Sequence, residues 1–129
     1  MKRFLWCAAL LWLGTPGWAD QVEGIWRTSK DYDGYSGDVE IRPCGPAFCG
    51  ILIRAFDRRD QEVFSESVGK MIVIDMVAYP DGLYDDGQVY SPDSDKTYNG
   101  ELRLSGDKLK VRGCVLGICR NGGIWRRIK

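Results

Sequence analysis

The chain has 129 residues, with 18 basic and 18 acidic side chains and no histidine. Its length predicts one domain, and its balanced charge argues against a strongly cationic nucleic-acid binder. Without histidine, Ser-His-Asp and Cys-His nucleophile pairs and histidine-ligated catalytic metals are excluded. We therefore expect no catalytic residues, no metal site and no cofactor.

Residues 1–19 have the layout of a secretory signal peptide. Lys2 and Arg3 precede ten apolar residues that end at Leu13, and the small residues Gly17 and Ala19 mark the expected cleavage point. Ten apolar residues are too few to cross a bilayer, which takes about 20. We predict a periplasmic or secreted protein whose mature domain, residues 20–129, has a net charge of −2 and no transmembrane segment. An uncleaved membrane anchor is the competing interpretation.

The mature chain alternates apolar and polar residues between recurrent turn signals, which is typical of short antiparallel strands. The expected strands are Glu23–Thr28, Asp38–Pro43, Phe48–Phe56, Met71–Tyr79, Gly87–Ser91, Thr97–Ser105, Leu109–Val115 and Ile124–Ile128. The expected turns are Asp31–Gly34, Pro80–Gly82, Pro92–Asp95, Ser105–Lys108 and Asn121–Gly123. The polar segment Asp57–Ser67 predicts a loop with a short helical turn. These elements predict an all-β fold, a small up-and-down antiparallel barrel of about eight strands.

The two ends of the mature chain carry matching closure signals. Gly24 and Trp26 lie on the first strand, and Trp125 and Arg127 lie on the last. These two strands are neighbours in a closed barrel, so the guanidinium of Arg127 can stack on the indole of Trp26 and plug one end. Arg126 is the alternative partner, because it points to the other face of its strand.

Four cysteines remain after Cys7 is removed with the signal peptide. They form two equally spaced pairs, Cys44 with Cys49 and Cys114 with Cys119. In an exported protein this pattern predicts disulfides. A zinc site is the competing interpretation, although structural zinc usually takes closer pairs. Because the two segments lie at opposite ends of an up-and-down barrel, the strand order favours the two local bonds.

Seven short segments, taken in order and spacing, resemble a family of exported bacterial proteins known as domain of unknown function 2147. The segments are Gly24–Trp26, Val39–Cys44, Phe48–Ile51, Gly87–Pro92, Lys96–Leu102, Val111–Cys114 and Trp125–Arg127. The chain departs from the family pattern at Ser91, where aspartate is frequent, and at Tyr84, where tryptophan is expected. The resemblance implies a lipocalin-like, calycin-type barrel and export, and it implies no activity.

The expected inner face of the barrel is aliphatic and uncharged. It consists of Val39, Ile41, Leu102, Leu104, Leu109 and Val111. A catalytic cup would need convergent polar groups, which these strands do not supply. An eight-stranded barrel either holds one small molecule or is filled by its own side chains, and both interpretations stay open here.

Two further groups of residues are candidates for binding. The tyrosines could line a rim that contacts a ligand, or they could be ordinary strand residues with their hydroxyls in water. They are Tyr79, Tyr84, Tyr90 and Tyr98. The aspartates lack the rhythm of a calcium loop and are typical of solvated turns. They are Asp81, Asp85, Asp86, Asp93 and Asp95.

The expected function is therefore non-enzymatic binding of a small apolar or amphipathic ligand. The alternative is a protein-interaction module, such as an inhibitor of an exported hydrolase or a partner of another envelope protein. An enzyme that works with carboxylates alone comes third.

Overall fold

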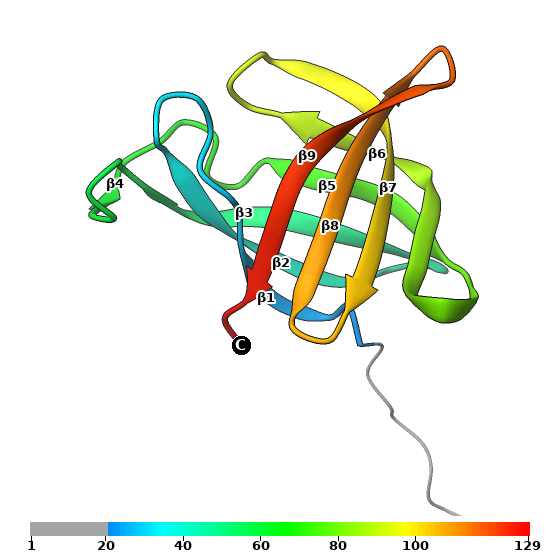
Figure 1. Ribbon diagram of the computed structural model, residues 1–129. Helices are drawn as coiled ribbons and strands as arrows, with labels where there is room; N and C mark the ends of the chain where they lie inside the picture. The colour runs from blue at the N-terminus through cyan, green and yellow to red at the C-terminus, as the bar shows by residue number, and fades with distance from the viewer. Residues whose placement is uncertain (1–20) are drawn as a thin grey trace, which may run out of the picture.

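The computed structural model describes residues 21–129, which form nine strands and one short 3-10 turn (Figure 1). The predicted signal peptide, residues 1–19, lies outside the described residues. The strands are β1 (Gly24–Arg27), β2 (Ser36–Cys44), β3 (Ala47–Phe56), β4 (Glu62–Val63), β5 (Met71–Ala78), β6 (Leu83–Ser91), β7 (Lys96–Ser105), β8 (Lys108–Val115) and β9 (Ile118–Arg127). The 3-10 turn η1 (Pro80–Gly82) joins β5 to β6.

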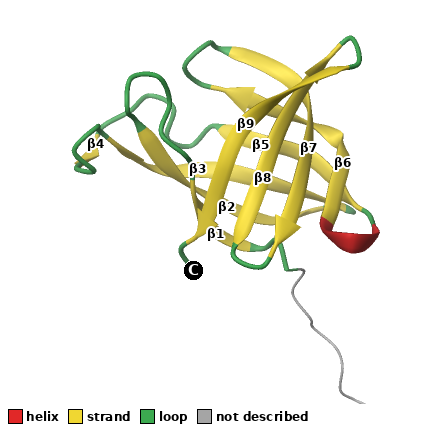
Figure 2. Ribbon diagram, in the orientation of Figure 1, coloured by secondary structure: helices red, strands yellow, loops and turns green. Residues whose placement is uncertain are grey.

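Eight of these strands close into an antiparallel barrel (Figure 2). When β4 is left out, each pairs with the strand before and after it in the chain, so that β3 pairs with β5, and β9 pairs with β1 to complete the circle. The two-residue β4 is the exception, because it pairs with the edge of β3 and takes no part in the closure. The structure thus confirms the predicted up-and-down barrel.

The hydrophobic core fills one end of the barrel. Its fully buried side chains include Trp26, Ile41, Met76, Leu102 and Leu109. Five of the six predicted inward residues are buried, and the sixth, Leu104, is partly buried against the same cluster. Alternation along the regular strands therefore identifies the inner face correctly.

Strand β5 departs from the simple alternation expected of it. The sequence pattern places Val73 and Met76 on opposite faces, yet both are fully buried. Asp75 lies between them with a φ of 51°, and an extra residue in a bulge lets two side chains of opposite parity reach the same face. Gly87 makes room for the bulge, because a Cβ there would lie 2.7 Å from the Asp75 carbonyl oxygen.

The last predicted turn is wrong. The chain reverses at Leu116 and Gly117, whose φ values of 53° and 80° are typical of a type I′ hairpin turn. Asn121–Gly123 lies inside β9, where the pairing with β8 shifts register and Gly123 has a φ of 103°. The Gly-Gly pair thus serves a bulge instead of a turn. The segment Asp57–Ser67 likewise carries β4 in place of the expected helical turn.

Two cysteine pairs lie at disulfide distance, each across a hairpin. Cys44 and Cys49 join β2 to β3 with a Cα–Cα distance of 5.8 Å. Cys114 and Cys119 join β8 to β9 with a Cα–Cα distance of 3.9 Å. The pairs are local, and the hairpins that carry them, β2–β3 and β8–β9, lie at opposite ends of the barrel, as the strand order predicts.

Candidate ligand-binding site

One end of the barrel is closed by an indole and a guanidinium. Trp26 is fully buried, and its Nε1–H donates a hydrogen bond of 2.9 Å to the carbonyl oxygen of Val22. Arg127 pairs with Trp26 across the β1–β9 ladder, and its guanidinium carbon lies 4.4 Å from the centre of the indole ring. Arg127 also donates a hydrogen bond of 3.0 Å to the carbonyl oxygen of Glu23. The plug therefore connects β1, the first strand of the barrel, to β9, the last.

The other closure residues have separate places. Gly24 leaves room for the plug, because a Cβ there would lie 2.8 Å from Nη1 of Arg127. Trp125 is buried and forms part of the wall of the cavity described below. Arg126 is exposed on the outer face of β9 and does not cover Trp26.

The opposite end of the barrel holds an open cavity of about 1300 Å³. Its apolar lining from the barrel wall comprises Val39, Leu52, Ala55, Ile72, Val89, Val111 and Trp125. The loop that follows β1 and the β8–β9 hairpin surround the mouth. The barrel is thus filled by its own side chains at the plugged end and hollow at the open end. The sequence left open whether the barrel is filled or has room for a small molecule, and each interpretation describes one end.

The structure brings two of the four candidate tyrosines to this cavity. Tyr90 and Tyr98 line it. Tyr84 is buried in the core, where its ring meets that of Phe48 edge-on at 5.8 Å. Tyr79 follows β5 on the outside of the barrel and donates its hydroxyl proton to Asp86. A register shift between Tyr84 and Gly87 in β6 brings Val89, and not Tyr90, into phase with Tyr84, which sequence spacing does not reveal.

The hydroxyl of Tyr90 is held at the cavity wall by a carboxylate. It donates a hydrogen bond of 2.7 Å to Oδ1 of Asp95, and Lys70 Nζ lies 5.5 Å from the centre of its ring. The hydrogen bond to Asp95 and the negative charge of that carboxylate raise the pKa of Tyr90 above its ordinary value.

We expect Asp95→Asn to lower the pKa of Tyr90 toward that of a free tyrosine, because an amide carries no charge to oppose the phenolate. Alkaline titration followed by ultraviolet difference spectroscopy measures the pKa of Tyr90. The part of the phenolate absorbance that is lost in Tyr90→Phe identifies the contribution of this residue. Since the folded-state pKa is raised, the contact stabilises the fold below the ordinary tyrosine pKa, and this stabilisation is lost as the pH rises through the raised value. A titration curve that Asp95→Asn leaves unchanged would contradict the assignment.

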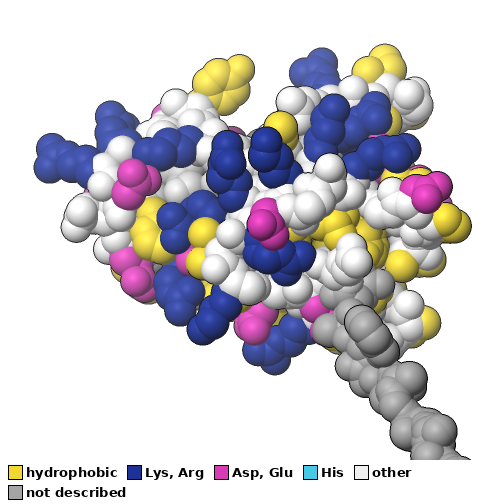
Figure 3. Space-filling view, turned by 60° about the horizontal axis from the view of Figure 1, so that its bottom comes forward, with side chains coloured by type: hydrophobic (Ala, Val, Ile, Leu, Met, Phe, Trp, Pro, Cys, Tyr) yellow, Lys and Arg dark blue, Asp and Glu magenta, His cyan; other side chains and the backbone are white. Residues whose placement is uncertain are grey.

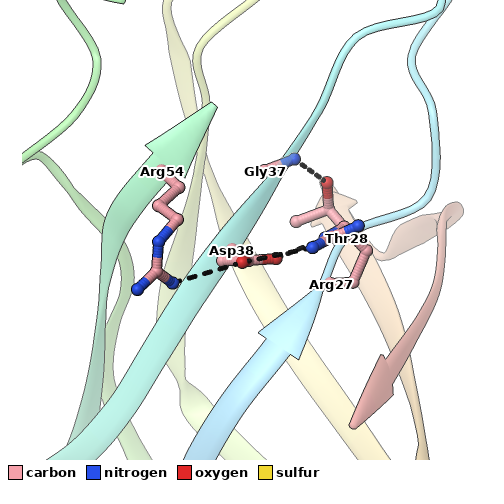
Figure 4. A network of polar contacts seen from close by, with 5 residues as sticks. All are labelled: Arg27, Thr28, Gly37, Asp38 and Arg54. Atoms are coloured by element: carbon pink, nitrogen blue, oxygen red, sulfur yellow. Dashed lines mark hydrogen bonds and ion pairs between the residues drawn. The ribbon is translucent and has the colours of Figure 1, made fainter. Parts of the chain in front are cut away.

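A buried carboxylate on the outer wall is the feature that sequence reasoning missed. The side chain of Asp38 is 3% exposed and lies between two arginines of neighbouring strands (Figure 4). Arg27 donates from Nε to one carboxylate oxygen and from Nη2 to the other at 3.3 Å, and Nη1 of Arg54 lies 3.4 Å from the second oxygen. The hydrogen bond to Asp38 raises the pKa of Arg27 above its ordinary value. The group holds β1, β2 and β3 together.

The buried carboxylate does not face the cavity. The Arg27 guanidinium covers the ring of Phe56 with a separation of 4.1 Å. Figure 4 shows the nearby contact in which the N–H of Gly37 donates to Oγ1 of Thr28 at 2.9 Å. Alternation in β2 puts Asp38 on the outer face, but its partners lie on two other strands. The strand register decides that contact, and no local sequence signal indicates it.

Within residues 21–129, one group of side chains has the spacing of a metal site. It comprises Cys44, Cys49 and Asp75, whose ligand atoms lie within 4.8 Å of one another. The two sulfurs are joined to each other, and a metal needs deprotonated thiols. In this state the group is a disulfide beside a carboxylate. Among the same residues, no helix is both long and apolar enough to span a bilayer.

A closed eight-stranded antiparallel barrel, plugged at one end and hollow at the other, defines a lipocalin-like protein. The chain belongs to the family described as "Uncharacterized protein conserved in bacteria (DUF2147)", whose model matches residues 24–127. This confirms the resemblance seen in the sequence.

A solved structure has the same architecture. It is the protein HP1028 from the human pathogen Helicobacter pylori, which is described as belonging to the lipocalin family. The two structures superpose with a TM-score of 0.67 over 84% of each chain, at 16% sequence identity. At this identity the likeness establishes the fold alone. The comparison with curated proteins finds no match.

Proposed function

We propose that the chain is an exported, non-enzymatic binding protein that holds a small apolar or amphipathic ligand in its open cavity. The observation that carries the proposal is the hollow end of the barrel, with its volume of about 1300 Å³ and its apolar wall. Small-molecule sites usually measure roughly 300–1,000 Å³, so this cavity has room for such a ligand together with an open mouth.

The distribution of polar groups suits a ligand with one apolar and one polar end. Val89, Val111 and Trp125 form part of the wall from the barrel interior, and burying apolar ligand surface against them is favourable by roughly 25 cal/mol per Å². Arg120 lies close to the β8–β9 turn at the mouth, Tyr98 lines the cavity beside Val89, and both offer hydrogen-bond donors. An amphipathic molecule would therefore bury its apolar body and leave its polar end at the rim.

Two features support the non-enzymatic and exported parts of the proposal. The inward strand residues of the cavity wall, such as Val39, Leu52 and Val111, carry no acid or base. The carboxylates of the lining, Asp31, Asp33 and Asp93, lie in the loops between strands, whereas a catalytic cup needs such groups converging on one point. The two cysteine pairs lie at disulfide distance, and such bonds persist in oxidising compartments such as the periplasm.

Filling the cavity is expected to abolish binding without unfolding the barrel. Ala55 lies on the cavity wall, so the indole in Ala55→Trp would occupy the space meant for the ligand. We expect the affinity for anilinonaphthalene sulfonate, an apolar fluorescent probe, to fall at least about tenfold. Fluorescence titration measures the affinity, and thermal unfolding shows that the variant is folded.

Ile51→Trp is the matched control. Ile51 lies on the same strand, is 42% exposed and does not line the cavity. Its replacement should leave probe affinity within about twofold of the original. Equal loss in both variants, or no loss in Ala55→Trp, would refute binding in the cavity. If the probe binds in the cavity, native mass spectrometry of protein purified from its own source would identify any natural molecule that the cavity retains.

A further inference from the structure

A carboxylate lies beside the disulfide of the β2–β3 hairpin. Oδ1 of Asp75 is 3.7 Å from Sγ of Cys44 and 3.6 Å from Sγ of Cys49. Sulfurs that are joined to each other carry no proton, so neither can donate a hydrogen bond to this oxygen. The approach of the carboxylate to both sulfurs therefore contributes no hydrogen bond in the oxidised state, whereas two thiols or a cation would give the carboxylate a partner.

The fold directs Asp75 toward the sulfurs through the bulge in β5. Regular alternation would place Asp75 on the inner face with Val73, which is fully buried. The bulge at Asp75, whose φ is 51°, re-aims its side chain to the outside. Asp75 is exposed and Cys44 is partly exposed, so a reductant and a metal ion can reach the group from solvent.

The separations agree with the geometry of a tetrahedral zinc ion. Zn–S bonds of about 2.3 Å and Zn–O bonds of about 2.1 Å at a tetrahedral angle place sulfur and oxygen roughly 3.6 Å apart. The two Sγ–Oδ1 distances lie close to this value, and the three ligand atoms lie within 4.8 Å of one another. Four residues separate the two cysteines, which is the widest spacing that is common in zinc sites. Reduction would let the two sulfurs move apart to make room for the ion.

The second cysteine pair lacks this arrangement. Cys114 and Cys119 have the same spacing in the sequence and face each other across the β8–β9 ladder. Within residues 21–129, however, they belong to no group of three ligand atoms that could hold a metal ion. The two pairs thus differ in the neighbouring carboxylate, and Cys114 and Cys119 provide an internal control.

Ligand atoms, and not surface charge, would select the ion. Figure 3 shows Lys and Arg side chains gathered over the barrel surface as seen from the closed end. The β2–β3 hairpin lies at that end, opposite the β8–β9 hairpin that borders the mouth. Asp85 and Asp86 line the same open hollow as Asp75, but neither belongs to the ligand group. A cation would therefore be held by the atoms that bind it directly.

We propose that reduction of the Cys44–Cys49 disulfide opens a zinc site formed by the two thiolates and the carboxylate of Asp75. A dithiol reductant breaks the S–S bond, both sulfurs become thiols, and the reductant becomes a disulfide. Zn²⁺ then displaces the two thiol protons, and two Zn–S bonds and one Zn–O bond form. A water molecule completes the four-coordinate shell. This inference is independent of the ligand proposed for the cavity.

The donor set favours zinc over other ions. Thiolates select soft and borderline ions, which excludes Mg²⁺ and Ca²⁺, whereas a carboxylate oxygen suits Zn²⁺ better than copper(I). Without a cation, two thiolates and the carboxylate would bring three negative charges together, and like charges at this separation repel. The ion should therefore stabilise the reduced hairpin.

Protection of the thiols from alkylation tests the proposal in the unaltered protein. The protein is reduced with dithiothreitol, which is then removed by gel filtration under nitrogen, and circular dichroism shows whether the barrel remains folded. Iodoacetamide is added with and without Zn²⁺, and peptide mapping gives the rate at each cysteine. We expect Zn²⁺ to slow alkylation of Cys44 and Cys49 at least about tenfold and to change that of Cys114 and Cys119 less than about twofold.

Titration with Co²⁺ gives a second readout, because thiolate ligands produce a charge-transfer absorption in the near ultraviolet. Asp75→Asn keeps a residue type that tolerates a positive φ, and it should weaken Co²⁺ binding by the reduced protein at least about tenfold. Asp85→Asn is the matched control, since it removes a carboxylate of the same hollow that is not a ligand, and it should change the affinity less than about twofold.

Several results would overturn the proposal. Equal protection of the two cysteine pairs would show that Asp75 does not create a site, and this includes the case in which reduction unfolds the barrel and all thiols react alike. Equal Co²⁺ affinity of the oxidised and reduced protein would assign binding to carboxylates alone. Unchanged affinity in Asp75→Asn would remove Asp75 from the ligand set. Absence of protection at about 100 μM Zn²⁺ would show that no such site forms.

Discussion

Replacing Trp26 with alanine is expected to lower the free energy of unfolding by about 3–5 kcal/mol, the usual range for truncating a buried aromatic residue. The indole is fully buried, makes a hydrogen bond of 2.9 Å to Val22, and supports the guanidinium of Arg127 at 4.4 Å. Its loss removes the plug that joins the first strand to the last, so the β1–β9 seam should weaken together with the core.

Urea denaturation followed by far-ultraviolet circular dichroism measures this loss. Tyr32→Ala is the matched control, because the ring of Tyr32 is fully exposed, and it should change stability by less than about 0.5 kcal/mol. The loss of stability in Trp26→Phe should lie between those of Trp26→Ala and Tyr32→Ala, because phenylalanine keeps a buried ring but lacks the N–H donor. A loss below about 1 kcal/mol in Trp26→Ala would show that the plug does not hold the barrel closed.

Replacing Asp38 with asparagine is expected to cost about 2 kcal/mol, because hydrogen bonds to charged groups contribute about 1.5–3 kcal/mol each. The carboxylate is 3% exposed and receives donors from Arg27 and Arg54. The side chains of the two arginines are 33% and 45% exposed, so water can take over part of their solvation. The cost should therefore fall below the 3–5 kcal/mol of a fully buried broken pair.

Glu40→Gln is the control for this carboxylate. Glu40 lies two residues further along the same strand and pairs with Arg42 at 2.8 Å, and the side chain of Arg42 is 71% exposed. An exposed ion pair contributes about 0–1 kcal/mol to stability. We therefore expect Glu40→Gln to lower the free energy of unfolding by an amount near the lower end of that range. If Asp38→Asn and Glu40→Gln cost the same in urea denaturation, the three-residue group would not stabilise the barrel beyond an ordinary surface pair.

Features that depend on residue type and short spacing could be predicted from the sequence. Alternation identifies Val39 and Ile41 as inward, and the positions of Trp26 and Arg127 on the first and last strands indicate where the circle closes. The local cysteine pairs follow from strand order alone. All of these features depend on the two-residue period of a strand or on the pairing of strands that follow one another in the chain. Both can be recognised in a single sequence.

Features that depend on register could not be predicted. A bulge at Asp75 reverses the inward parity of β5, and Gly123 produces another bulge where the sequence indicates a turn. The hollow end has a similar cause, because Gly37, Ala55 and Gly113 meet there from three different strands. Small residues leave a cavity only where the register brings them together, so no local pattern distinguishes a filled barrel from an open one.

The two ends of the described chain leave the barrel side by side. The N–H of Ile25 donates to the carbonyl oxygen of Lys129 at 3.1 Å, and the N–H of Lys129 donates to that of Ile25 at 3.2 Å. Both ends lie beside the plug, away from the cavity mouth (Figure 1). A tag or surface anchor joined to either end would therefore hold the barrel with its mouth facing outward. The orientation of an immobilised sample would not depend on which end is attached, and a short linker could join the two ends into a ring.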